Sequence, residues 1–182
     1  MRRYKHFIFT TLLVFTTIAT IYAEIDLSKL IVNTAPVKNS HTMVQQSDLI
    51  VLGSPDDAVK KYPTKKTVDQ FKIVNYVQTF HTQKGLKGSF PSLVKIVSVG
   101  IEPLPNPSNP INRLYPGPLA KENYILFLKK VPQSEYYTII GGWQGVYPLF
   151  EGKIISFEGL GFKEFSGLTV NQLEQKIKEL AG

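Results

Sequence analysis

The sequence predicts a mainly β fold, a small antiparallel barrel that ends in one amphipathic helix. Apolar segments of five to fifteen residues recur along the chain, and several alternate apolar with polar residues, which is typical of half-buried strands. Glycine and proline, with 13 and 12 residues, fall mostly between these segments and indicate turns and loops. The C-terminal segment instead repeats apolar residues every three to four positions, as a helix does.

The first 23 residues have the order of a secretory signal peptide. Three basic residues precede an apolar run over 7–21, and Ala23 ends the segment. This run of 15 residues is shorter than the about 20 that a membrane-spanning helix needs. We therefore expect cleavage between Ala23 and Glu24 and a product that is secreted to the extracellular side of the membrane. An uncleaved segment would be its membrane contact.

Composition limits the class of protein. Without residues 1–23 the chain keeps 159 residues, the length of one domain, with 18 basic against 14 acidic residues, a net charge of +4 instead of +7. This mild excess favours weak attraction to anionic polymers, and nucleic acid is not expected as a partner. The chain has no cysteine. An exported chain without disulfides favours a bacterial source, because small secreted animal domains commonly depend on them.

The N-terminal arm and a short helix are expected at 24–47, ahead of the barrel domain at 48–182. Residues 24–39 mix apolar and polar side chains, so this segment could be a short helix or an arm that lies on the core. Ser40 is a candidate N-cap for a brief helix that ends near Ser47.

The first half of the domain predicts three strands. Residues 48–53 form a short apolar run closed by turn residues, which indicates a buried strand. Residues 54–67 contain two prolines and four lysines and are predicted to be an exposed loop. Alternation over 68–82 indicates a long strand. A turn is expected at 85–88, and another strand at 93–99.

The second half begins with a long surface loop. Residues 101–118 hold six prolines, which lack the N–H donor that a strand ladder needs. The strongest strand signal is the apolar run at 124–128, expected to pair with 136–140. Residues 146–150 and 153–157 are predicted to form a final hairpin.

One amphipathic helix is expected at the C-terminus. Thr169 is a good N-cap, Gln172 completes a capping box, and Leu168 can pack onto Leu173. The apolar stripe of this helix consists of Val170, Leu173, Ile177 and Leu180. Five or more strands with one late helix predict a small β-barrel.

Five motifs add a family resemblance. They are Gln46–Gly53, Leu86–Gly88, Tyr124–Lys129, Gly141–Tyr147 and Gly167–Thr169. In this order they resemble a group of uncharacterised exported bacterial proteins with an OB-like barrel, similar in outline to netrin-like and metalloproteinase-inhibitor domains. The resemblance covers residues 46–180 and implies an OB-like fold. Animal metalloproteinase inhibitors bind the catalytic metal through an N-terminal cysteine, which this chain lacks.

No set of residues predicts catalysis, a cofactor or a metal site. His41 and His81 lie forty positions apart, and neither has a second ligand at metal-binding spacing. No serine lies in a G-x-S-x-G motif, and no pair of carboxylates can be assigned. We therefore expect a protein that is not an enzyme; an enzyme with an unrecognised site would depend on His81 or Asp48.

The first candidate binding surface is the segment around the only tryptophan. Trp143, Gln144 and Tyr147 lie among three glycines, where the backbone can bend sharply. Aromatic side chains in such segments often anchor partners. The alternative is that the glycines permit a barrel corner and Trp143 fills the core.

The second candidate is a set of four lysines, Lys60, Lys61, Lys65 and Lys66. OB barrels bind extended polymers on one face through stacked aromatics and basic flanks, so this set could hold an anionic polymer. The alternative is a solvated, charged loop.

The sequence thus favours an exported, non-enzymatic binding module of the cell envelope or extracellular space. Its partner would be a protein or an envelope polymer that meets the Trp143–Tyr147 region and the proline-rich loop. Two alternatives stay open: a protease-inhibitor-like protein that acts through its free N-terminus from Glu24, and an anionic-polymer binder. A purely structural envelope protein would have none of these activities.

Overall fold

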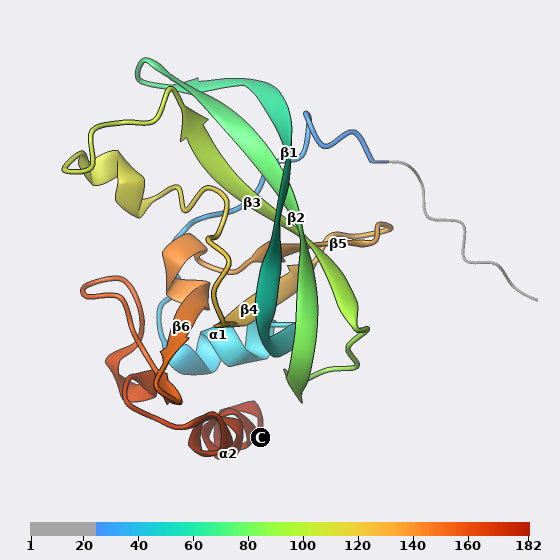
Figure 1. Cartoon of the computed structure of the whole chain (residues 1–182), viewed down its shortest axis with the longest axis vertical. Coiled ribbons are helices and arrows are strands. Elements are labelled where there is room, and N and C mark those ends of the chain that lie inside the picture. Colours follow the sequence, from blue (N-terminus) through green and yellow to red (C-terminus); the bar gives the residue numbers. More distant parts are fainter. Residues whose placement is uncertain (1–24) are drawn as a thin grey trace, which may run out of the picture.

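The computed structural model describes residues 25–182 (Figure 1). The signal segment and the cleavage site between Ala23 and Glu24 lie outside the described residues, so both stay predictions. Within the described part no helix is long and apolar enough to cross a membrane.

Strands make up most of the ordered structure, as the sequence predicts. The strands are β1 Leu49–Val68, β2 Phe71–Lys87, β3 Leu93–Glu102, β4 Tyr124–Lys130, β5 Tyr136–Ile139, β6 Val146–Phe150 and β7 Lys153–Ile154. The α-helices are α1 Ser40–Gln46 and α2 Val170–Ala181, and the 3-10 helices are η1 Pro110–Arg113, η2 Gly142–Gly145 and η3 Lys163–Phe165.

Five of the strands close into a ring. β1 pairs with β2, β2 with β3, β3 with β5 and β5 with β4, and β4 returns to pair with β1. The β3–β5 pairing is parallel, whereas the other four are antiparallel. β6 pairs with β4 beside β5, and β7 extends the sheet from β6.

The core has two parts on opposite faces of β1 and β4. Leu49 and Val51 belong to a cluster that takes buried side chains from all five ring strands and fills the ring. Ile50 and Phe127 face the other way, into a cluster that α1 and α2 cover. Full burial of each such side chain contributes about 1.5–3 kcal/mol, so this two-sided burial explains the continuous apolar runs.

The long hairpin of β1 and β2 corrects one prediction. Residues 54–67 are part of strand β1, although the sequence predicts a loop there. This half of β1 pairs with β2 only, since its pairing with β4 ends at Gly53. It is therefore an edge strand, where proline is tolerated, and register shifts follow both Pro55 and Pro63.

Other predicted elements are confirmed with changed bounds. The expected turn at 85–88 begins later, because β2 continues to Lys87 and only Gly88 has a positive φ, 80°. The expected strand at 153–157 shortens to Lys153–Ile154. The capping box of Thr169 and Gln172 is present at the start of α2.

Residues 25–39 form an arm, the first part of which lies on the outer face of β2 and β3, and the structure places no helix there. Leu27 is 3% exposed and packs against Val77 and Val97. The side-chain amide of Asn75 donates to the carbonyl oxygens of Leu27 and Leu30 at 2.8 and 2.9 Å. The arm, blue in Figure 1, crosses these strands before it reaches α1.

Candidate functional site

The tryptophan segment is tied to the rest of the chain. Trp143 lies in η2 after Gly141, whose φ of 65° is in the left-handed region that favours glycine. The half-buried indole packs edge-on against Phe157, with ring centroids 5.0 Å apart. Its Nε1 donates to the carbonyl oxygen of Asn112 at 2.9 Å. The indole therefore makes both its ring contact and its hydrogen bond within the protein.

Gln144 and Tyr147 also make internal contacts. The Gln144 amide binds the backbone N–H and carbonyl of Val37, in the arm. Tyr147 is fully buried, and its hydroxyl accepts a hydrogen bond from the Phe162 N–H at 3.0 Å. Burial raises the pKa of Tyr147 well above its usual range. This side chain has no exposed surface with which to contact a partner, so the segment joins the arm to the core.

The four candidate lysines divide between two faces of the hairpin. Lys60 lies opposite Val77, and Tyr62 opposite Asn75, so these residues share the outer face that the arm covers in part. Lys61 lies on the other face, where its Nζ binds Glu102 at 2.6 Å. The bond from Lys61 holds the pKa of Glu102 below its usual range, and the Tyr76 hydroxyl adds to this effect.

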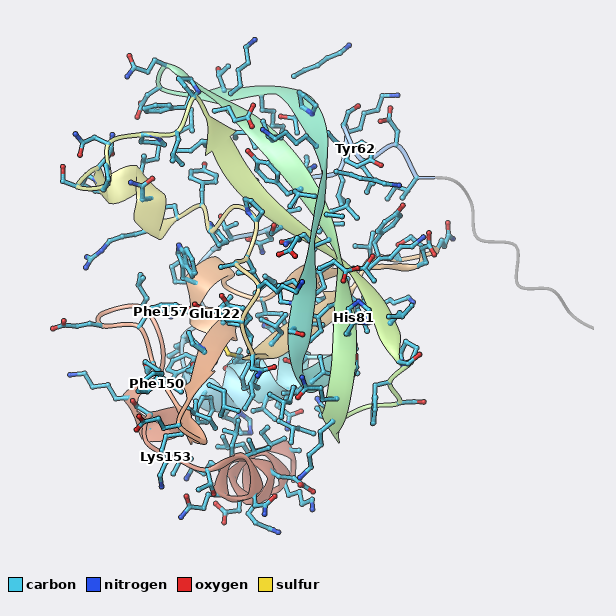
Figure 2. All side chains as sticks on the ribbon, viewed as in Figure 1. Tyr62, His81, Glu122, Phe150, Lys153 and Phe157 are labelled. Atoms are coloured by element: carbon cyan, nitrogen blue, oxygen red, sulfur yellow. The ribbon has the colours of Figure 1, made fainter. Side chains whose placement is uncertain are left out.

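Lys65 and Lys66 join the outer face further along the hairpin. Both line a cavity of about 300 Å³ between the arm, the hairpin and β3. A second cavity of about 110 Å³ is lined in part by Lys60, Tyr62 and Tyr136. We call this surface the arm-side face; it consists of Lys60, Tyr62, Lys65, Lys66, Asn75 and Val77. Figure 2 shows Tyr62 beside the arm.

The charges on the arm-side face are unbalanced. Lys60, Lys65 and Lys66 form no ion pair with a carboxylate of residues 25–182, as is also true of other lysines such as Lys153 and Lys163. Lys95 also lines the smaller cavity, but its Nζ is 2.5 Å from Glu135. The face therefore carries three amino groups whose charge is available to an anionic ligand.

Sequence reasoning missed Asn75 and Tyr62. Asn75 is 1% exposed in the middle of β2, where an amide has to find partners, and alternation along 68–82 places it with Ile73 and Val77. The signal was therefore a polar residue on an apolar face of a predicted strand. Tyr62 had no signal of this kind, because its segment was predicted to be a loop.

The histidines do not gather with other candidate ligands. Nε2 of His81, labelled in Figure 2, lies 2.6 Å from a carboxylate oxygen of Asp56, and this exposed pair joins β2 to β1. His41 is exposed on α1. Asp48 instead binds Lys129 and the backbone N–H of Lys130. Across residues 25–182, no three His, Cys, Asp or Glu side chains group closely enough to hold a metal ion.

No protein-family model matches the chain, and no curated protein matches it.

Proposed function

We propose that the chain is a non-enzymatic binding module of the cell envelope or extracellular space, and that it holds an anionic polymer on the arm-side face. The observation that carries this proposal is the set of Lys60, Lys65 and Lys66, which lie on one face without a described acidic partner. Exposed amino groups of this kind attract an anion without first breaking an internal ion pair.

The topology supports an OB-like barrel for the ring. A five-stranded ring that closes through one parallel pairing, β3 with β5, has the strand arrangement expected of a Greek-key barrel. Barrels of the OB type bind oligosaccharides and oligonucleotides over strands 2 and 3 and the adjacent loops. The arm-side face lies on one of the corresponding strands, β2, which pairs with β3, and on the part of β1 beyond Gly53.

The chemistry of the face suits a flexible polyanion. Lysine is a compact charge on a mobile stem, so it follows a chain of anionic groups without fixed geometry. Tyr62 and Tyr136 line the smaller cavity with Lys60 and offer apolar ring surface to the units of a polymer. The open edge of β1 beyond Gly53 leaves room for a ligand longer than either cavity.

Binding of fluorescently labelled polyphosphate to residues 24–182 tests the proposal, with anisotropy measured at several salt concentrations. A triple variant, Lys60→Gln, Lys65→Gln and Lys66→Gln, should weaken binding at least about tenfold at low salt, because each exposed charge contact contributes a fraction of a kcal/mol. The matched control is Lys153→Gln, Lys163→Gln and Lys176→Gln, which removes the same charge. Figure 2 shows Lys153 far from Tyr62.

The comparison of the two triples decides the outcome. A strong loss of polyphosphate affinity in the first triple variant, with little loss in the second, supports the arm-side face as the binding surface. Equal loss in both would mean that polyphosphate responds only to net charge, and the proposal would be wrong. The inhibitor alternative has less support, because Ile25 and Leu27, at the start of the arm, pack against the domain.

A further inference from the structure

The larger cavity of the arm-side face has the composition of a small-molecule site. Its volume of about 300 Å³ reaches the lower limit of typical ligand pockets, about 300–1,000 Å³. Leu30, Val32, Ile73, Val99 and Tyr115 give it a mainly apolar lining. Ile31 also lines it and is 70% exposed, a large apolar side chain left in water at the cavity. Contact with an apolar ligand would remove the apolar surface of these side chains from water, which is favourable.

Asn75, which lines this cavity, has one polar atom without a partner among the described residues. Asn75 lines the cavity and is 1% exposed, and its Oδ1 is buried without a hydrogen bond to any of residues 25–182. Both amide hydrogens bind carbonyl oxygens of the arm, so the orientation of the amide is fixed: a flipped amide would face two acceptors with an oxygen. A buried acceptor left without a donor costs about 1–3 kcal/mol.

The cavity also has basic side chains. Lys65 and Lys66 line it and form no ion pair within the described part of the chain, whereas Lys29, a third lining residue, lies 3.0 Å from Asp26. Two amino groups are therefore available beside an apolar lining, an arrangement that suits the head group of an amphiphile.

We propose that this cavity binds a small anionic amphiphile. Its apolar body would contact Ile31, Ile73 and Val99, its anionic head would meet Lys65 and Lys66, and a hydroxyl or amide N–H would donate to Asn75 Oδ1. This site goes beyond the polymer face, because it depends on a mainly apolar cavity that a polyanion does not need. The cavity and the polymer face share Lys65 and Lys66, so an amphiphile bound in the cavity would compete with the polymer for these two lysines.

Calorimetric titration of residues 24–182 with decanoate tests the proposal, with decanol as the uncharged probe. Decanoate should bind at least about fivefold more tightly than decanol, since the head gains charge-assisted hydrogen bonds. 3-Hydroxydecanoate and 10-hydroxydecanoate place a donor near each end of the chain. At least one should bind about fivefold more tightly than decanoate if it satisfies Asn75 Oδ1. Equal affinity of all three acids would overturn the role of Asn75.

Three variants separate the cavity from the polymer face. Ile73→Trp fills the cavity from a half-buried strand position, so it should abolish decanoate binding and leave polyphosphate binding unchanged. The double variant Lys65→Gln, Lys66→Gln should weaken the binding of both decanoate and polyphosphate. Lys60→Gln, at the smaller cavity, should weaken polyphosphate binding alone. Thermal melting of each variant checks that the fold is retained, and Ile31→Ser, at an exposed position, repeats the test of the apolar wall if Ile73→Trp does not fold.

Two results would overturn the proposal. One is the absence of decanoate binding up to its solubility limit, which would leave the cavity to water. The other is binding to phosphatidylglycerol vesicles without binding of any free acid, which would make the arm-side face a membrane contact. Loss of polyphosphate binding in Ile73→Trp would instead count against a separate cavity.

Discussion

Gln144 binds both backbone polar groups of Val37, a residue 107 positions earlier in the chain. Its Oε1 accepts from the Val37 N–H at 2.5 Å, and its Nε2 donates to the Val37 carbonyl at 3.4 Å. The side-chain amide thus pairs with the arm much as a neighbouring strand would. It joins η2 to the end of the arm, the earlier residues of which line the larger cavity.

Gln144→Ala should loosen the arm without unfolding the ring. Loss of the two hydrogen bonds should cost about 1–2 kcal/mol and increase hydrogen exchange at 30–38. Gln45→Ala is the matched control, because Gln45 also donates to backbone carbonyls but at the end of α2, at Leu180 and Ala181. Unchanged exchange in the arm of Gln144→Ala would contradict the bracing role.

Acid should weaken the attachment of α2 through Glu174. Hydrogen bonds from Lys84 and Lys178 lower the pKa of Glu174 to about 2, from an ordinary value of 4.5. Because the folded pKa is lowered, the contribution is complete above pH 4.5 and is lost as the pH falls toward 2. Glu174→Gln should therefore be less stable than the parent at pH 6 and equal to it near pH 2.

Denaturant unfolding at several pH values measures this difference. Glu179→Gln, on the same helix, is the control: Lys176 lies 3.8 Å from its carboxylate and the side chain is 68% exposed, so its effect should be small at every pH. A constant difference between Glu174→Gln and the parent from pH 6 to 2 would contradict the assigned linkage.

Gly53 should tolerate no side chain, because β1 and β2 approach closely there. A Cβ at Gly53 would overlap the backbone oxygen of His81 and lie 2.7 Å from the Phe80 ring. Gly53→Ala should therefore destabilise the protein by about 3 kcal/mol or more, the upper range for overpacking. Gly152→Ala, at a φ of 73° with open space around it, should cost about 1–2 kcal/mol. Equal midpoints of unfolding for the two variants would refute the steric cause.

Strands buried on both faces could be predicted from sequence, whereas the edge strand could not. Residues 124–128 are apolar throughout because one face of β4 fills the ring and the other meets the helices. Residues 54–67 carry lysines and prolines because this part of β1 pairs on one side only. Their strand conformation depends on β2, a partner that no local pattern identifies.

The candidate site also depends on how β1 pairs with β2. Four lysines could be identified as basic, but their faces could not. The register of β1 against β2 places Lys60 and Lys61 on opposite faces and leaves Lys65 and Lys66 in the irregular stretch after Pro63. No residue count predicts where such a register shift falls. Tyr147 and Trp143 likewise have similar local sequence surroundings, yet one is fully buried and the other half-buried.

Trp143 should contribute to stability and not to polymer binding. Trp143→Ala removes the edge contact with Phe157 and the hydrogen bond to Asn112, so we expect a loss of about 2–3 kcal/mol, less than for a fully buried tryptophan. Trp143→Phe retains an aromatic ring beside Phe157 and loses the indole donor, and it should cost about 1 kcal/mol. Polyphosphate affinity should be unchanged in both variants, measured where each remains folded. A large loss of affinity in Trp143→Phe would return the tryptophan segment to the binding surface.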